Sequence, residues 1–231
     1  MAPVKGTRVL DEELKGINEK VQELGQAVRQ TYLDMRNILE TNDKEMALAL
    51  VRNDETINEM EEEINEETIR IIALQAPVAT DLRVLISALK IAGQLERIAD
   101  YAVNVADYVL LVRDTTSLPT TPAINIMLSF IVEMLELVMQ AYSEQNLKLA
   151  KEVAAMDNKL DEMYGEALEL ILKKANTEEL TEYDLKTTLI IKYLERAGDH
   201  ITNVAESIAY LVKGRSYDLN KGIAKRKTYK I

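Results

Sequence analysis

The stretch QLERIADYAVNVADYV (94–109) decides the fold, because the chain repeats its pattern in YLERAGDHITNVAESI (193–208). Both copies carry Glu-Arg, an Asp three residues after the Arg, an Asn four further on and an acid three after that. The copies are 99 positions apart (193 − 94 = 99). Apolar residues recur at three- and four-residue spacing nearly throughout the chain, which is typical of helices. The sequence therefore predicts a helical protein that places one acidic pattern twice.

A second pair of stretches extends the duplication. VRNDETINEM (51–60) matches AAMDNKLDEM (154–163), which places Asp54 opposite Asp157 and Asn58 opposite Asp161. The offset is 103 here (157 − 54) and 99 in the later helix, so the second copy has four fewer residues between those points. Two homologous three-helix bundles are the economical interpretation.

Few turn-forming residues interrupt the helical pattern. We expect helices over about 10–39 and 43–74, a third ending near 112, a fourth ending near 143, a fifth over 146–174 and a sixth ending at Gly214. Thr181 and Asp184 are spaced as a capping box for the last helix. The fold class is all-α, with six long helices in two tandem homologous three-helix bundles. The predicted domains are a first bundle at 1–112, a linker at 113–122, a second bundle at 123–214 and a basic tail at 215–231. We expect the aperiodic end of that tail, KGIAKRKTYKI (221–231), to be loose.

Composition excludes several classes of function. The 231 residues have a net charge of −11, which disfavours nucleic-acid binding. No Cys is present, so disulfides, Cys-ligated zinc and a thiol nucleophile are excluded. The N-terminus has no apolar segment of a signal peptide, and the apolar stretch at 123–142 is interrupted by polar residues, so we expect a buried helix and no membrane insertion.

The acidic residues of the repeated pattern form one stripe on each helix. Successive helical residues are about 100° apart, so Glu96, Asp100, Asn104 and Asp107 share a narrow face. That stripe continues an apolar one, and like charges four residues apart repel, so a merely solvated face is the weaker alternative. Crowded carboxylates need protons, cations or water, and oxygen ligands suit Mg, Mn or Fe, with Zn also allowed. The predicted metal ligands are Asp54, Asn58, Glu96, Asp100, Asn104 and Asp107 in the first repeat, and Asp157, Asp161, Glu195, Asp199, Asn203 and Glu206 in the second.

The motifs LQAPVATDLR (74–83), LERIADYAVNVAD (95–107) and LERAGDHITNVAE (194–206) resemble the PhoU family over nearly the whole chain. The resemblance implies an all-helical, cytoplasmic protein with metal clusters, some multinuclear, on these acidic residues. It further implies a negative regulator of the phosphate-starvation response that modulates phosphate uptake. The implied partners are the ATPase subunit of a phosphate ABC transporter and a sensor histidine kinase, and a homodimer is compatible with the family.

The two copies differ at positions that bear on metal binding. Asn58 stands where the second copy has Asp161, so the second site has one more carboxylate and is predicted to bind metal more tightly. Ala99 and Tyr101 replace the more typical Gly198 and His200. Glu61 or Glu62 is within reach of the first stripe.

Two alternatives compete with a metal-binding regulator. A di-iron enzyme normally needs two Glu-x-x-His pairs, but His200 is the single His and is expected on the surface. No nucleophile–base pair or Gly-rich phosphate loop occurs, so we expect no enzyme. The stronger alternative is a helical scaffold, or a metal-binding or storage protein, without a role in phosphate signalling.

Overall fold

A computed structural model describes residues 5–111 and 121–219, and its ordered elements are all helical. Six helices follow one another along the chain: α1 (Lys5–Thr41), α2 (Lys44–Gln75), α3 (Ala79–Leu111), α4 (Pro122–Ser143), α5 (Leu147–Ala175) and α6 (Glu182–Lys213). Within the described ranges, this confirms the all-α fold with six long helices.

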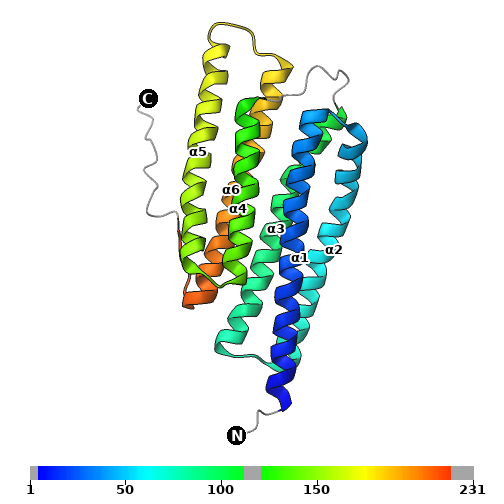
Figure 1. Cartoon of the computed structure of the whole chain (residues 1–231), viewed down its shortest axis with the longest axis vertical. Helices are drawn as coiled ribbons and strands as arrows, with labels where there is room; N and C mark the ends of the chain where they lie inside the picture. Colours follow the sequence, from blue (N-terminus) through cyan, green and yellow to red (C-terminus); the bar gives the residue numbers. More distant parts are fainter. Residues whose placement is uncertain (1–4, 112–120, 220–231) are drawn as a thin grey trace.

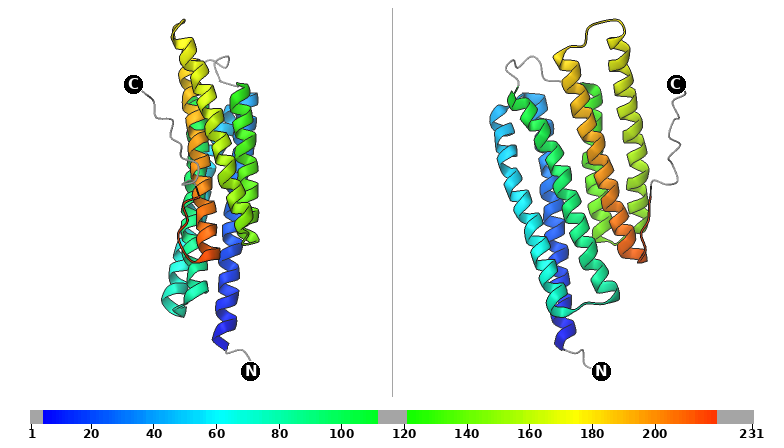
Figure 2. Two further views of the ribbon diagram at one scale, coloured as in Figure 1. Left: turned by 90° about the vertical axis from the view of Figure 1, so that its left-hand side faces the viewer. Right: turned by 180° about the vertical axis from the view of Figure 1, so that it is seen from behind.

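The helices form two bundles that lie side by side (Figure 1). Helices α1–α3 pack together in the first bundle, and α4–α6 do so in the second. The bundles join through two helix pairs, α3 against α6 and α1 against α4, which leaves α2 and α5 at the outer edges. Figure 2 shows α3 and α6 lying next to each other on the face seen from behind.

Local sequence signals fix the helix ends. Thr181 and Asp184 form the predicted capping box at the start of α6, and Gly214 ends α6 with a left-handed φ of 69°. Thr121 caps α4 and Pro122 occupies its first turn, where the missing N–H of proline costs nothing. Ala76 ends α2 in a left-handed conformation directly before Pro77, which cannot continue a helix.

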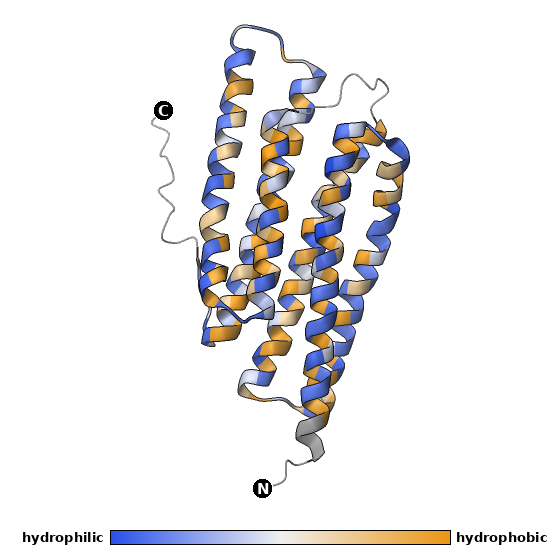
Figure 3. Cartoon of the chain, in the orientation of Figure 1, coloured by the Kyte–Doolittle hydropathy of each residue, from blue (hydrophilic) through white to orange (hydrophobic). Residues whose placement is uncertain are grey.

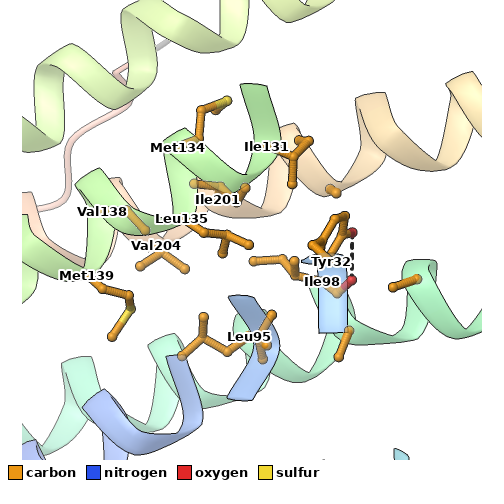
Figure 4. Packing of buried hydrophobic residues seen from close by; sticks show 14 of the residues in the cluster. Tyr32, Leu95, Ile98, Ile131, Met134, Leu135, Val138, Met139, Ile201 and Val204 are labelled. Atoms are coloured by element: carbon orange, nitrogen blue, oxygen red, sulfur yellow. Dashed lines mark hydrogen bonds between the residues drawn. The ribbon is translucent and has the colours of Figure 1, made fainter. Parts of the chain in front are cut away.

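The apolar residues form one core that runs through both bundles. Figure 3 shows hydrophobic and hydrophilic residues alternating along the helices. Figure 4 shows side chains of both bundles meeting, among them Leu95, Leu135 and Val204. Tyr32 is fully buried in this contact, and its hydroxyl donates to the Ile98 carbonyl at 2.9 Å. The two repeats are therefore packed into one body.

Helix α4 supplies much of this shared core. Met127, Met134 and Met139 are buried in it, as expected of core fillers. The helix is also long and apolar enough to cross a membrane, with a mean hydropathy of 1.7 over an 18-residue window. Half of that window is buried inside the structure (50%).

The predicted linker at 113–122 falls outside the described residues except for Thr121 and Pro122, which begin α4. Of the predicted basic tail, the structure describes 215–219. There the Leu219 side chain packs against the core and its N–H donates to Glu206 Oε1 at 2.8 Å. This part of the tail is anchored, and the segment 221–231 that we expected to be loose lies outside the described residues.

Candidate metal centres

The first acidic cluster lies where α2 packs against α3, and we define it by Asp54, Asn58, Glu61, Glu96, Asp100 and Asp107. Burial raises the pKa of Asp54, and the Asp107 carboxylate raises it further. Burial also raises the pKa of Glu96, with added repulsion from Asp100, Glu61 and Asp54. These mutual effects show that carboxylates from both helices face one another across the seam.

Two contacts orient the α2 side of this cluster. Asn58 Nδ2 donates to Asp54 Oδ2 at 3.4 Å, while Asp54 Oδ1 is buried and makes no hydrogen bond among the described residues. Glu61 Oε1 accepts from Asn65 Nδ2 at 2.5 Å and lies 3.7 Å from the place where a Cβ of Gly93 would stand. A buried carboxylate oxygen without a partner is costly, so Asp54 has one oxygen available for a cation.

The second acidic cluster lies where α5 packs against α6, and we define it by Asp157, Asp161, Lys192, Glu195 and Asp199. Burial raises the pKa of Asp199, and Glu195 and Asp161 raise it further. Burial and then Glu195 raise the pKa of Asp161, which Lys192 lowers. Carboxylates of both helices therefore meet here as well, beside Lys192 and within the field of Arg196.

Lys192 and Gly198 give the second cluster its own geometry. Lys192 Nζ donates to Glu195 Oε2 at 2.5 Å and lies 5.1 Å from the ring centroid of Tyr164, in a cation–π contact. A Cβ at Gly198 would stand 2.3 Å from Leu160 Cδ2 and 2.8 Å from Asp157 Oδ1. Gly198 thus allows α5 to approach closely, and Asp157 is only 3% exposed.

Three predicted ligands are oriented away from these clusters. Asn104 is exposed, and its amide donates to the Asp100 carbonyl of its own helix at 2.8 Å. Asn203 donates to Gln94 Oε1 at 3.0 Å, across the α3–α6 contact. Glu206 accepts from the backbone of Leu219. Helical angle alone placed these residues on the acidic stripe, but their hydrogen bonds direct them elsewhere.

His200 is not the surface residue that the sequence analysis expected. It is half-buried between α3 and α6, where Nδ1 lies 2.7 Å from Gln94 Oε1 and Nε2 lies 3.2 Å from the Tyr101 hydroxyl. Burial lowers the pKa of His200, and the guanidinium charges of Arg97 and Arg196 lower it further. This places His200 near both arginines and engages both of its ring nitrogens outside the acidic clusters.

The donor sets fit a hard cation, although the carboxylates are not drawn together. Among the described residues, no group of three or more His, Cys, Asp or Glu side chains stands close enough to hold a metal ion. The clustered donors are carboxylate and amide oxygens, which suit Mg, Mn and Fe. Asp54, Glu96 and Asp100 would hold a cation in the first repeat, and Asp157, Asp161 and Asp199 would do so in the second. The cation would offset the mutual repulsion of these carboxylates.

Similarity to known proteins covers both repeats. The family model for the PhoU domain matches residues 21–109 and again 124–208. A phosphate-specific transport system accessory protein PhoU homolog of Zymomonas mobilis is 33% identical over 209 residues, covering 90% of this chain and 88% of the relative. The Clostridium acetobutylicum homolog is 32% identical over 92% of this chain and 98% of its own length.

Two solved structures have the same fold. The crystal structure of the phosphate transport system regulatory protein PhoU from Streptococcus pneumoniae superposes with a TM-score of 0.85 at 28% identity, covering 90% of this chain and 99% of that structure. PhoU from Pseudomonas aeruginosa gives a TM-score of 0.79 at 30% identity, over 89% of this chain and 99% of that structure. The chain, with its two PhoU domains, belongs to the PhoU family.

Proposed function

We propose that this protein is a negative regulator of the phosphate-starvation response that modulates phosphate uptake by binding other proteins in the cytoplasm. It is an accessory, regulatory protein of phosphate transport and not an enzyme. Its proposed partners are the ATPase subunit of the phosphate importer and a sensor histidine kinase. The observation that carries the proposal is the match to PhoU domains in both halves of the chain.

The acidic clusters would contribute to this role by binding metal. Five groups of the two clusters have raised pKa values because burial disfavours their charged forms: Asp54, Glu96, Asp100, Asp161 and Asp199. A bound cation would relieve that repulsion and hold α2 against α3 and α5 against α6. We propose divalent or trivalent ions, with Mn, Mg and Fe better suited than Zn to ligands that are all oxygen atoms.

Net charge predicts how partners are recognised. At −11, the protein should dock on basic patches of its partners, because complementary potentials favour encounter and suppress wrong complexes. Exposed charges are screened beyond about 8 Å at physiological ionic strength, so both complexes should weaken as salt rises.

The test combines genetics with binding. In a deletion strain grown in high phosphate, we expect phosphate-starvation genes to be derepressed. The purified protein should bind the importer's ATPase subunit and the kinase at low salt. Normal repression in the deletion strain, or purified protein that binds neither partner at low salt, would contradict the proposal.

A further inference from the structure

The contact between α3 and α6 carries an approximate two-fold axis. Tyr101 and His200 occupy equivalent positions of the two repeats (200 − 101 = 99), and their side chains meet at 3.2 Å. Gln94 and Tyr193 are also equivalent (193 − 94 = 99). Gln94 contacts His200, and in the matching contact the Tyr193 ring lies 5.8 Å from the Tyr101 ring. Equivalent residues thus face each other across the axis, as in an isologous interface.

Two arginines flank this axis. Arg97 and Arg196 are also equivalent (196 − 97 = 99), and each lies four residues before a member of the Tyr101–His200 pair. Residues four apart share a helix face, so the two guanidinium groups stand on either side of the Tyr101–His200 contact. Both arginines are exposed, and both lie near enough to act on the His200 ring.

Neither of these arginines forms an ion pair with a carboxylate of the described residues, unlike Arg29 and Arg70. Arg29 pairs with Glu136 at 3.2 Å, and Arg70 pairs with Glu13 at 3.2 Å. Arg97 and Arg196 form no ion pair with any residue that the structure describes. In a chain of net charge −11, two such cations at the centre of one face are available for an anion.

We propose that Arg97 and Arg196, with the Tyr101–His200 pair between them, form a binding site for inorganic phosphate. Guanidinium presents paired N–H donors that match the oxygens of a tetrahedral oxyanion. The Tyr101 hydroxyl donates its proton to His200 Nε2, because His200 Nδ1 donates to Gln94 Oε1, so the two guanidinium groups supply the donors to the anion. The choice of phosphate among oxyanions rests on the proposed regulatory function.

The neighbouring acidic clusters set the strength of this site. Arg97 follows Glu96, and Arg196 follows Glu195, but each arginine is turned about 100° from the acid before it. No carboxylate of the described residues forms an ion pair with either guanidinium group, although Arg97 lowers the pKa of Glu96 and Asp100 and Arg196 lowers that of Asp199. The negative field of these acids opposes an incoming anion. A cation bound at the clusters would cancel that field, so phosphate should bind more tightly to metal-loaded protein.

The experiment measures binding of inorganic phosphate to the full chain by calorimetry at low ionic strength, after treatment with chelator and again after loading with Mn²⁺. We expect wild-type protein to bind in both states. The double variant Arg97→Gln/Arg196→Gln should bind about tenfold more weakly or worse in both, because it loses two charge-assisted contacts. The matched control is Arg52→Gln on α2, an exposed arginine in no ion pair among the described residues, and its affinity should equal that of wild type.

Three results would overturn the site. Wild-type protein could fail to bind phosphate in both states. The double variant, verified as folded by circular dichroism, could bind as tightly as wild type. Phosphate could bind only after Mn²⁺ loading, and equally tightly to wild type and to the double variant, which would place the anion on the metal. Each result would leave the proposed partner binding intact, because repression and partner assays measure that role separately.

Discussion

The first and second acidic clusters derive from one repeated pattern, but the repulsion among their carboxylates is balanced differently. In the first, Glu61 lies over Gly93. At the equivalent places of the second, Tyr164 (164 − 61 = 103) lies against Lys192 (192 − 93 = 99), which pairs with Glu195. Arg97 acts on Glu96 and Asp100 in the first cluster, and Arg196 acts on Asp199 in the second. The second cluster has Lys192 in addition, in an ion pair with Glu195.

This difference changes the expected order of metal affinity. The sequence analysis predicted tighter binding in the second repeat, because Asp161 replaces Asn58. The structure adds Glu61 to the first cluster and Lys192 to the second. The first cluster then has five carboxylates, which feel the field of Arg97 but form no ion pair with a described residue, and the second has four with Lys192 in an ion pair among them. We now predict that the first cluster binds metal more tightly.

Removing ligands should have the largest effect. Glu96→Ala/Asp100→Ala and Glu195→Ala/Asp199→Ala should each abolish roughly half of the metal bound at saturation, since each pair serves one cluster. At limiting metal, the first double variant should lose more, because the first cluster fills first. Elemental analysis of protein purified without chelator measures both quantities. Unchanged stoichiometry in either variant would contradict the assignment of that cluster.

Removing Lys192 from the second cluster, or adding a lysine to the first, should reverse the order of metal affinity of the two clusters. Lys192→Met removes a positive charge from the second cluster and should tighten its Mn²⁺ binding roughly tenfold. The reciprocal change, Gly93→Lys, should weaken the first cluster by a similar factor. Calorimetric titration of chelated protein tests both, and Lys148→Met on α5, remote from either cluster in the sequence, is the control. Equal affinities in all three variants would show that Lys192 does not limit metal binding.

Alanine substitutions at Gly198 and Gly93 should have different effects on the free energy of unfolding. Gly198→Ala places a Cβ against Leu160 and Asp157 and should cost about 1–3 kcal/mol of unfolding free energy. In Gly93→Ala the nearest atom is 3.7 Å away, and the gain in helix propensity should leave stability unchanged or raise it by up to about 1 kcal/mol. Urea unfolding of chelated protein gives both values. Equal effects of the two substitutions would refute the close approach of α5 to α6.

The smallest effect is the pH dependence of the metal-free protein. Asp54, Glu96, Asp100, Asp161 and Asp199 have folded-state pKa values above 3.8 for Asp and 4.5 for Glu. The folded state therefore binds protons first, and these groups make the protein more stable as pH falls from neutral through their raised values. The gain should be smaller in Glu96→Gln/Asp100→Asn, which removes two of the groups. Thermal unfolding of chelated protein across this range would contradict the account if stability fell instead.

Much of this molecule could be predicted from the sequence because helices have a fixed period. The helix boundaries followed from caps such as the Thr181–Asp184 box and from Gly214. The duplication correctly paired Asp54 with Asp157 at the two outer seams, because equivalent residues take equivalent places in homologous bundles. Asp100 and Asp199 also face α2 and α5, as the acidic stripe predicted.

The placement of the other site residues depended on how the helices pack against one another. The periodicity of a single helix carries no information about that packing. Asn203 lies on the same stripe as Asp199, but α3 is close enough for Gln94 to bind it. Glu206 is directed away by its hydrogen bond from the backbone of Leu219, and His200 is enclosed by Tyr101 and Gln94. These contacts join residues more than 90 positions apart or follow a reversal of the chain, so local spacing carried no signal for them.

The central claim is that both repeats bind metal on their acidic clusters and that the first binds more tightly. Anomalous diffraction at the manganese edge tests it most directly, on crystals of unchelated protein titrated with increasing Mn²⁺. The account predicts a peak between α2 and α3 near Asp54, Glu96 and Asp100 at low Mn²⁺, followed by a peak between α5 and α6 near Asp157 and Asp199 at higher Mn²⁺. No peak at either seam under saturating Mn²⁺, or a second-repeat peak that appears first, would contradict it.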